Sequence, residues 1–167
     1  MDRLNPESAY PLSPMQQGML FHNLYAPQSG VNLQQIIGTL HHPLNVSIFR
    51  QAWEKTLARH PVLRTSFHWE GLKTPMQEVH ADVELPFVME DWSALSEDAR
   101  AQKFQVCLNA DRHRGFIFTD APLMRLAVFQ LGENEFQFVW TFHHAVLDGR
   151  SFATILNEVF AFYDAIL

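Results

Sequence analysis

A strand, a short polar loop and a helix follow one another without a break between residues 135 and 165, and they constrain the fold most. In residues 135–142 every second side chain is aromatic, which predicts a β-strand with one strongly apolar face. Residues 151–165 carry apolar side chains at three- and four-residue steps, which predicts an amphipathic helix. The loop between them, residues 143–149, reads His-His-Ala-Val-Leu-Asp-Gly. Loops held by rigid elements commonly carry chemistry, so this one is the first candidate for a functional site.

The rest of the chain alternates between helical and strand patterns. Helices are predicted at 15–24, 46–60 and 96–112, and strands at 33–40, 62–69, 76–80, 85–89 and 123–131. Residues 1–14 are predicted to be an extended lead-in. Residues 132–134, Gly-Glu-Asn, join two of the strands and indicate a hairpin. We therefore expect a single α+β domain in which helices pack on a mixed sheet with antiparallel pairs.

Composition narrows the classes of function. The chain has 167 residues, 47% of them hydrophobic, which is enough for one core. Its net charge of −6 and its lack of a basic run argue against binding to nucleic acid. We expect no transmembrane helix and no signal peptide, because no apolar stretch of about 20 residues exists. The single cysteine, Cys107, suits a reducing compartment and hence a cytoplasmic location. Asn45, within an Asn-Val-Ser triplet, is predicted to cap the following helix rather than to carry a glycan.

The residue types of the 143–149 loop suit proton transfer. A histidine titrates near neutral pH, so His143 or His144 can accept or donate a proton. Asp148 can orient a ring or hold the loop through an ion pair, and Gly149 can let the backbone turn sharply into the helix. A merely polar strand end remains the alternative. We expect no metal site, because adjacent histidines at a strand end point to opposite faces.

Three segments together resemble a known family. The loop HHAVLDG resembles the HHxxxDG motif of condensation domains in nonribosomal peptide synthetases, which belong to the chloramphenicol acetyltransferase-like superfamily. Residues 10–22, YPLSPMQQGMLFH, are similar to the opening motif of these domains, in the variant that accepts a D-configured donor. Residues 59–67, RHPVLRTSF, are similar to the second motif, RHxxLRTxF. One departure is Arg150, which stands where many family members have a tryptophan.

The resemblance implies a particular architecture. Residues 1–167 are expected to form the N-terminal lobe of a condensation domain, one lobe of the chloramphenicol acetyltransferase-like fold. In the family a second, C-terminal lobe follows, and the active site lies in the channel between the lobes. That C-terminal lobe is absent from this chain. We therefore expect an open apolar face that promotes self-association, and little catalysis by the chain alone.

The resemblance also implies a reaction and its partners. Family members join an acyl or peptidyl thioester, carried on the phosphopantetheine arm of a carrier protein, to the amine of a second aminoacyl group. His144, the second histidine of the motif, would accept a proton or hold the amine, with His143 in support. Asp148 would pair with Arg64 of the second motif, and Gly149 would let the chain enter the helix. No cofactor is expected to bind directly, and the partners are carrier proteins and the C-terminal lobe.

Three other functions remain open at this point. A coenzyme A-dependent acyltransferase shares the histidine motif, and so does an epimerisation domain. A non-catalytic lobe that only docks carrier proteins is the alternative from outside enzymology. The match to RHxxLRTxF favours condensation, and the intact His144, Asp148 and Gly149 argue against a degenerate module.

Overall fold

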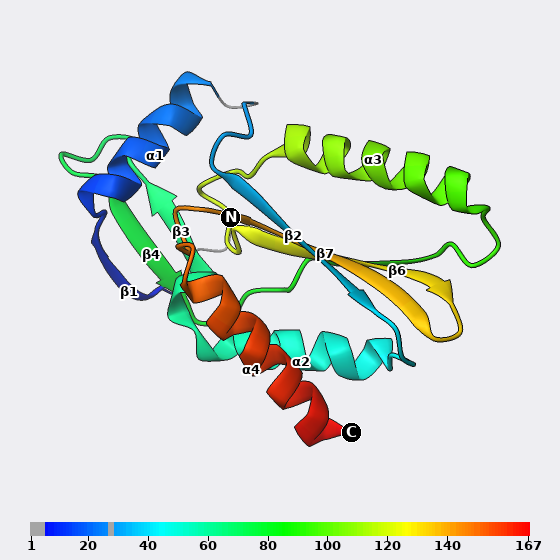
Figure 1. Ribbon diagram of the computed structural model, residues 1–167. Coiled ribbons are helices and arrows are strands. Elements are labelled where there is room, and N and C mark those ends of the chain that lie inside the picture. Colours follow the sequence, from blue (N-terminus) through cyan, green and yellow to red (C-terminus); the bar gives the residue numbers. More distant parts are fainter. Residues whose placement is uncertain (1–5, 27–28) are drawn as a thin grey trace.

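The computed structural model describes residues 6–26 and 29–167 (Figure 1). Its helices and strands agree closely with the predicted order. Along the chain they are β1 (Pro6–Pro11), α1 (Pro14–Tyr25), β2 (Leu33–Leu40), α2 (Val46–Arg59), the 3-10 helix η1 (Pro61–Arg64), β3 (Thr65–His68), β4 (Met76–His80), β5 (Phe87–Asp91), α3 (Glu97–Arg114), β6 (Met124–Gly132), β7 (Glu135–His143) and α4 (Ser151–Ile166).

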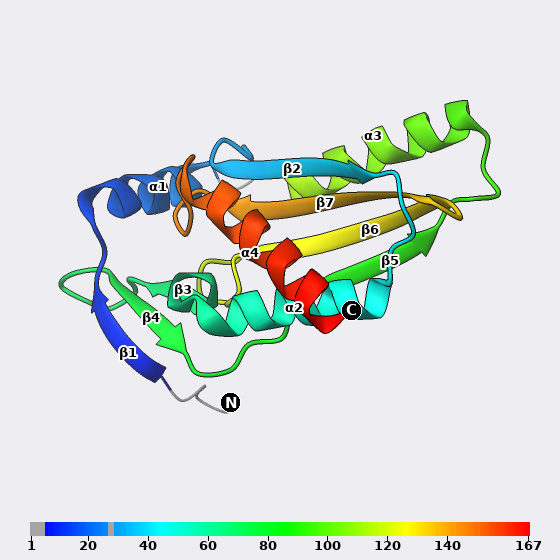
Figure 2. The same cartoon turned by 60° about the horizontal axis from the view of Figure 1, so that its bottom comes forward.

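The described strands form two sheets. A small antiparallel sheet has the order β1-β4-β3, and a larger one has the order β2-β7-β6-β5. In the larger sheet β5 runs parallel to β6, whereas the other neighbours are antiparallel, so the sheet is mixed as expected. Helices α2 and α4 cover one face of this sheet and α3 covers the other, while the small sheet lies at one end beside α1 (Figures 1 and 2). The α+β prediction is confirmed.

The core lies between the larger sheet and the α2–α4 pair. Every second residue of β7 from Phe136 to Phe142 is buried in it, as the alternation predicts. Trp140 of β7 packs against Trp53 of α2, with ring centroids 4.9 Å apart, and neither side chain is exposed. Gly38 of β2 lies opposite Phe138, whose ring occupies the space that a Cβ atom would need. Close packing between β2 and β7 therefore requires glycine at that position.

Helix α3 is attached to the sheet differently. None of its residues is buried, and its few apolar side chains meet a smaller cluster around Trp92, Phe129 and Val139. Polar contacts hold its C-terminal half: the Asp111 carboxylate pairs with Arg125 of β6 and accepts a hydrogen bond from Thr141 of β7 at 2.6 Å. The apolar side of α3 is therefore narrow, and polar contacts contribute much of its attachment to the sheet.

Two predicted segments differ from the structure. The sequence predicts one strand over residues 62–69, but the first part forms η1, because Pro61 favours a helical start and Leu63 N donates to His60 O at 3.0 Å. The expected extended lead-in contains a strand, β1, which pairs with β4. Prolines at both ends of β1 fit its place at the sheet edge and hide the strand pattern in the sequence. Residues 1–5 of the lead-in lie outside the described residues.

The expected cap at Asn45 is present. Asn45 caps α2, since its side-chain oxygen accepts a hydrogen bond from Ile48 N at 3.1 Å. Within residues 6–26 and 29–167, no helix combines the length and the hydropathy that a membrane span requires.

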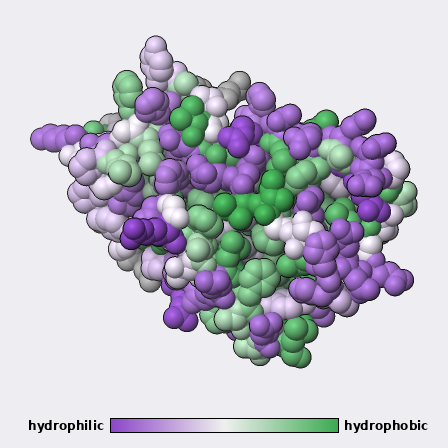
Figure 3. Space-filling view, in the orientation of Figure 1, coloured by the Kyte–Doolittle hydropathy of each residue, from purple (hydrophilic) through white to green (hydrophobic). Residues whose placement is uncertain are grey.

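Hydrophobic residues gather over the middle of the face that β2 and α4 present (Figure 3). Several large apolar side chains are exposed, among them Phe21 and Tyr25 of α1.

The tryptophan pair gives a test of the core. Trp140→Ala should lower the free energy of unfolding by ~3–5 kcal/mol, because it opens a cavity beside Trp53. Trp140→Phe should cost much less, because the indole N–H of Trp140 has no hydrogen-bond partner among the described residues. Urea unfolding followed by circular dichroism measures both. Equal losses for the two variants would mean that the indole nitrogen is bonded after all.

Candidate functional site

The loop after β7 is anchored on both sides by backbone hydrogen bonds. His143, the last residue of β7, donates its N–H to Leu123 O at 3.0 Å. His144 donates its N–H to Asn32 O, just before β2, at 2.8 Å. The two histidines are therefore held by the segments that flank β7, and their positions follow from the pairing of the sheet.

The His143 ring points into the protein. It is 4% exposed, lies edge-on to Phe118 with centroids 4.6 Å apart, and its Nδ1 accepts a hydrogen bond from Ala145 N at 3.1 Å. Burial, and then the charge of His144, lowers the pKa of His143 to about 4. His143 is consequently neutral at physiological pH, and its ring helps to shape the loop.

The His144 ring is half-buried, and one contact determines which of its two nitrogens carries the proton in the neutral ring. Nδ1 lies 2.6 Å from the carbonyl oxygen of Leu147. A carbonyl oxygen can only accept, so Nδ1 must carry the proton. In the neutral ring the lone pair is then on Nε2, which is the nitrogen that can accept a proton from a substrate.

Asp148 caps the helix that follows the loop. Its Oδ1 accepts hydrogen bonds from Arg150 N at 3.0 Å, from Ser151 N at 2.8 Å and from the Ser151 hydroxyl at 2.7 Å. These bonds, led by the one from the Ser151 side chain, lower the pKa of Asp148. The exposed carboxylate thus binds the N-terminus of α4 through Oδ1, at a position where a negative charge is favourable.

The predicted ion pair between Arg64 and Asp148 is wrong. Arg64 is buried at the end of η1, and its Nη1 donates to the carbonyl oxygens of His80 and Ala81, the latter at 3.1 Å. Among the described residues no ion pair joins Arg64 to Asp148. The physical reason is local: the 3-10 turn directs Arg64 to the end of β4, and Asp148 accepts hydrogen bonds from Arg150 N and from Ser151.

The second motif does contact α4, but through its first two residues. Arg59 Nε lies 2.7 Å from Glu158 Oε1, and His60 Nε2 pairs with Glu158 Oε2. The end of α2 is thereby joined to the helix that follows the histidine loop. A signal for this contact exists in the sequence, because Glu158 adjoins the buried Val159 in the apolar stripe of α4.

Gly149 lies in the turn that leads into α4, as expected, but this turn does not use the freedom of a glycine. Its φ angle is not positive, and a Cβ atom there would meet nothing within 4 Å. Neither the backbone nor the packing requires glycine at this position. What the glycine does is leave free space beside the loop.

Two residues that connect other elements to the loop, Gln16 directly and Gln77 through Gln16, are not evident as such from the sequence. Gln16 of α1 donates from Nε2 to the carbonyl oxygen of Ala145 at 3.1 Å, and Gln77 of β4 is paired with Gln16. Gln16 lies in the opening motif, where the pattern indicates only a helix start. Gln77 belongs to none of the three motifs, so nothing in the sequence marks it.

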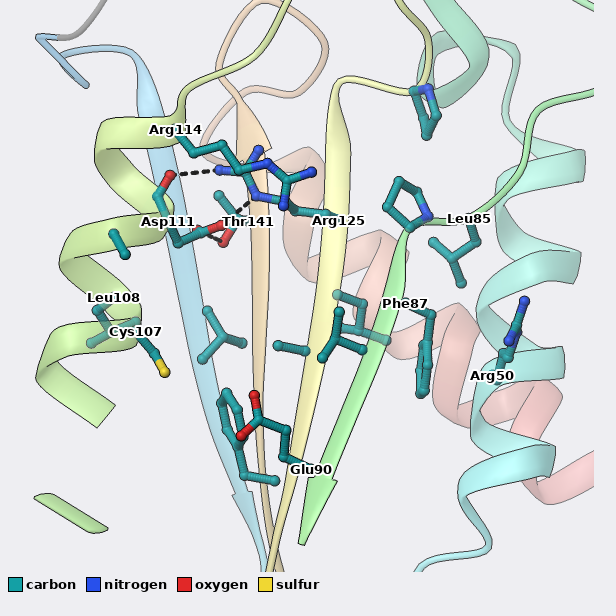
Figure 4. A pocket seen from close by; sticks show the side chains of 18 of the residues that line it. Arg50, Leu85, Phe87, Glu90, Cys107, Leu108, Asp111, Arg114, Arg125 and Thr141 are labelled. Atoms are coloured by element: carbon teal, nitrogen blue, oxygen red, sulfur yellow. Dashed lines mark hydrogen bonds and ion pairs between the residues drawn. The ribbon is translucent and has the colours of Figure 1, made fainter. Parts of the chain in front are cut away.

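A cavity of about 770 Å³ lies away from this loop, between α3 and strands β5, β6 and β7 (Figure 4). Its lining includes Phe87, Cys107, Leu108, Arg114 and Arg125, and His144 is not part of it. Among the described residues no group of three histidine, cysteine, aspartate or glutamate side chains is arranged to hold a metal ion. The candidate chemistry therefore stays with the loop.

The buried His143 gives a pH-dependence to test. Its pKa is lowered from 6.5 to about 4 in the folded protein, so the unfolded chain takes up the proton first. Its contribution is fully present above pH 6.5 and is lost as the pH falls towards 4, by roughly 3 kcal/mol in all. His143→Asn keeps an acceptor for Ala145 N but does not titrate. Urea unfolding at pH 7, 6 and 5 should show the wild type losing stability faster than the variant; parallel losses would contradict the assignment.

Comparison with known proteins identifies the family. The family model described as "Condensation domain" matches residues 6–167. A linear gramicidin synthase from Brevibacillus parabrevis is 46% identical over 160 residues, which is 96% of this chain and 3% of that protein. Tyrocidine synthase 2 of the same organism is 35% identical over 157 residues, 94% of this chain and 4% of that protein. The chain thus spans a few per cent of the length of these curated relatives.

Solved structures agree on the fold. The starter condensation domain of rhizomide synthetase superposes with a TM-score of 0.84 at 20% identity, over 96% of this chain and 40% of that one. The first condensation domain of the calcium-dependent antibiotic synthetase, in complex with a substrate analogue, gives a TM-score of 0.81 at 19% identity, over 97% and 40%. These likenesses confirm the expected chloramphenicol acetyltransferase-like fold. Since the family model also spans β1 to α4, the chain belongs to the condensation-domain family.

Proposed function

We propose that residues 1–167 form the N-terminal lobe of a condensation domain and supply its catalytic histidine. The reaction is amide formation between a carrier-bound acyl or peptidyl thioester and an aminoacyl amine in nonribosomal peptide synthesis. The observation that supports this most directly is the bond between His144 Nδ1 and the Leu147 carbonyl, which leaves Nε2 as the acceptor. Relatives that match the chain are named linear gramicidin synthase and tyrocidine synthase, which supports the proposal.

The proposed chemistry needs one proton acceptor. The amine attacks the thioester carbonyl, a C–N bond forms, the C–S bond breaks, and the nitrogen must lose a proton. His144 Nε2 takes that proton, or holds the amine for attack, and the thiolate leaving group is protonated in turn. An α-amino group has a pKa near 8, so a neutral imidazole beside it favours the reactive form. Two amides at the start of α4, Arg150 N and Ser151 N, are bonded to Asp148 and so are not free to bind the reacting groups.

The proposed partners follow from the reaction. The substrates arrive on the phosphopantetheine arms of carrier proteins, and a C-terminal lobe completes the channel. The protein itself binds no cofactor in this scheme and works in the cytoplasm. The exposed apolar side chains, including Phe21, Leu24 and Tyr25 of α1, support contact with partners and self-association of the chain.

A coenzyme A-dependent acyltransferase, an epimerisation domain and a non-catalytic docking module remain as alternatives. The same acceptor nitrogen would serve an acyltransferase, since its donor is also a thioester. The identity of 46% to a linear gramicidin synthase favours condensation over these. An assay that follows amide formation between two loaded carrier proteins separates condensation from the other three.

His144→Ala is the direct test of the catalytic assignment. In a two-lobe condensation domain that carries this chain, the variant should fold normally and form amide about 10²–10⁴-fold more slowly, the usual contribution of a general base. His42→Ala, at an exposed histidine before α2, is the matched control and should keep the wild-type rate. Wild-type turnover by the folded His144→Ala variant would exclude the proposed role.

The lobe proposal has its own test. The 167-residue chain should fold but form no measurable amide with loaded carriers, because half of the substrate channel is missing. Positioning of two reactants can contribute ~7–11 kcal/mol to a rate enhancement, and one wall cannot supply it. The comparison is with the two-lobe domain on the same carriers, together with the mass of the chain in solution. A monomer that turned over at the two-lobe rate would contradict the proposal.

A further inference from the structure

Two glutamine side chains form a bridge between the small sheet and the histidine loop. Gln16 Nε2 lies 3.1 Å from Gln77 Oε1, and Gln77 Nε2 lies 3.2 Å from Gln16 Oε1, so the amides bond to each other in both directions. Gln77 is 5% exposed and also donates to Pro11 O at 3.3 Å. Gln16 donates in addition to Ala145 O at 3.1 Å. The bridge thus ends on the residue directly after His144.

The orientation of the Gln16 amide follows from its partners. Ser13 N is a donor and lies 2.9 Å from Gln16 Oε1, within the capping box of α1. Ala145 O is an acceptor and must face the amide nitrogen. With the oxygen bound to Ser13 and the nitrogen bound to Ala145, the amide cannot be reversed without losing both bonds. A rigid helix start therefore presents a fixed N–H group to the loop.

Few other hydrogen bonds join the loop to the rest of the protein. The internal bonds of the loop run from Ala145 N to His143 Nδ1, from Val146 N to His143 O and from His144 Nδ1 to Leu147 O. Backbone bonds hold His143 N and His144 N to neighbouring segments. Among the described residues, Gln16 is the side chain from another element that is hydrogen-bonded to the peptide units between His144 and Leu147.

We infer that Gln16 and Gln77 are positioning residues for His144. By holding the Ala145 carbonyl, the amide pair fixes the turn that places the Leu147 carbonyl against His144 Nδ1, and so keeps the lone pair on Nε2. This inference rests on the proposed catalytic role of His144. It assigns a function to a residue of the opening motif and to Gln77, which lies outside all three motifs.

Gln16→Glu tests the inference with little change of shape. Glutamate still accepts from Ser13 N and is a favoured capping-box residue, so α1 should form as before. It has no N–H to give to Ala145 O, and it places a carboxylate beside that carbonyl. Gln77→Met is the second variant, which removes the partner amide without adding charge. Gln17→Glu is the matched control, because Gln17 is exposed and its side chain bonds, among the described residues, to Leu12 O alone, at 3.1 Å.

Two measurements separate positioning from general stability. Side-chain nitrogen NMR of His144 in this chain should show the Nδ1–H tautomer in the wild type and in Gln17→Glu, and a mixture of tautomers in Gln16→Glu and Gln77→Met. In a two-lobe condensation domain that carries the chain, kcat for amide formation should fall about 10- to 100-fold in Gln16→Glu, with KM for the loaded carriers unchanged.

The outcomes are distinguishable from failure of the proposed function. If His144→Ala keeps its activity, the catalytic role is wrong, yet the tautomer measurement still tests the bridge. If His144→Ala is inactive while Gln16→Glu and Gln17→Glu share one tautomer and one kcat, the positioning role is overturned. A change in KM alone would overturn it as well, since it would place Gln16 in carrier binding rather than in the geometry of His144.

Discussion

Strand β7 is the element on which the other parts of this structure depend. It pairs over nearly all of its length with β2 on one side and with β6 on the other. Its aromatic residues bury one face against α2 and α4, so a shift of one residue would turn the core outward. Because that register is so strongly specified, the point where the strand ends is specified too. The packing of Trp140 and its neighbours fixes the register of β7, and that register fixes the position of the histidine loop.

The two adjacent histidines at the end of β7 lie in different environments, and this gives them different roles. Successive side chains of a strand point to opposite sides, and here His143 turns into the protein while His144 stays half-buried at the loop. Burial removes His143 from acid–base chemistry near neutral pH by lowering its pKa to about 4. His144 keeps one nitrogen occupied by a backbone carbonyl and the other available. Of the two adjacent histidines, His143 thus has a structural role, and His144 is the one suited to chemistry.

The sequence predicts the elements much better than the side-chain contacts. β2, β4 and the β6–β7 hairpin can be located from apolar periodicity and turn residues, because those signals are local. Strand β1 cannot, since its prolines mask a strand that exists only through pairing with β4. The contacts of the loop are harder still. The family resemblance pairs Arg64 with Asp148, but a 3-10 turn before β3 directs Arg64 to the end of β4. Pro61 favours such a turn, but the strand pattern of residues 62–69 conceals it in the sequence.

The motifs themselves are best explained as contacts between distant segments. The opening motif supplies Gln16, which bonds to the loop, and the second motif supplies Arg59 and His60, which bind Glu158 of α4. The first contact holds the loop between β7 and α4, and the second holds the middle of α4 against the end of α2. Residues far apart in the sequence therefore fix the loop and the helix that follows it, and Asp148 bonds the start of that helix.

The same contacts bear on the proposal that this chain is one lobe of a two-lobe domain. Leu147 O, which bonds the His144 ring, and Gln16, which bonds Ala145 O, both belong to this chain. The proposed proton acceptor can therefore be held in place by residues of the chain itself. Substrate alignment is a separate requirement, since it needs walls on both sides of the reacting groups. Under the proposal, the geometry of the base is a property of one lobe, and the rate is a property of both.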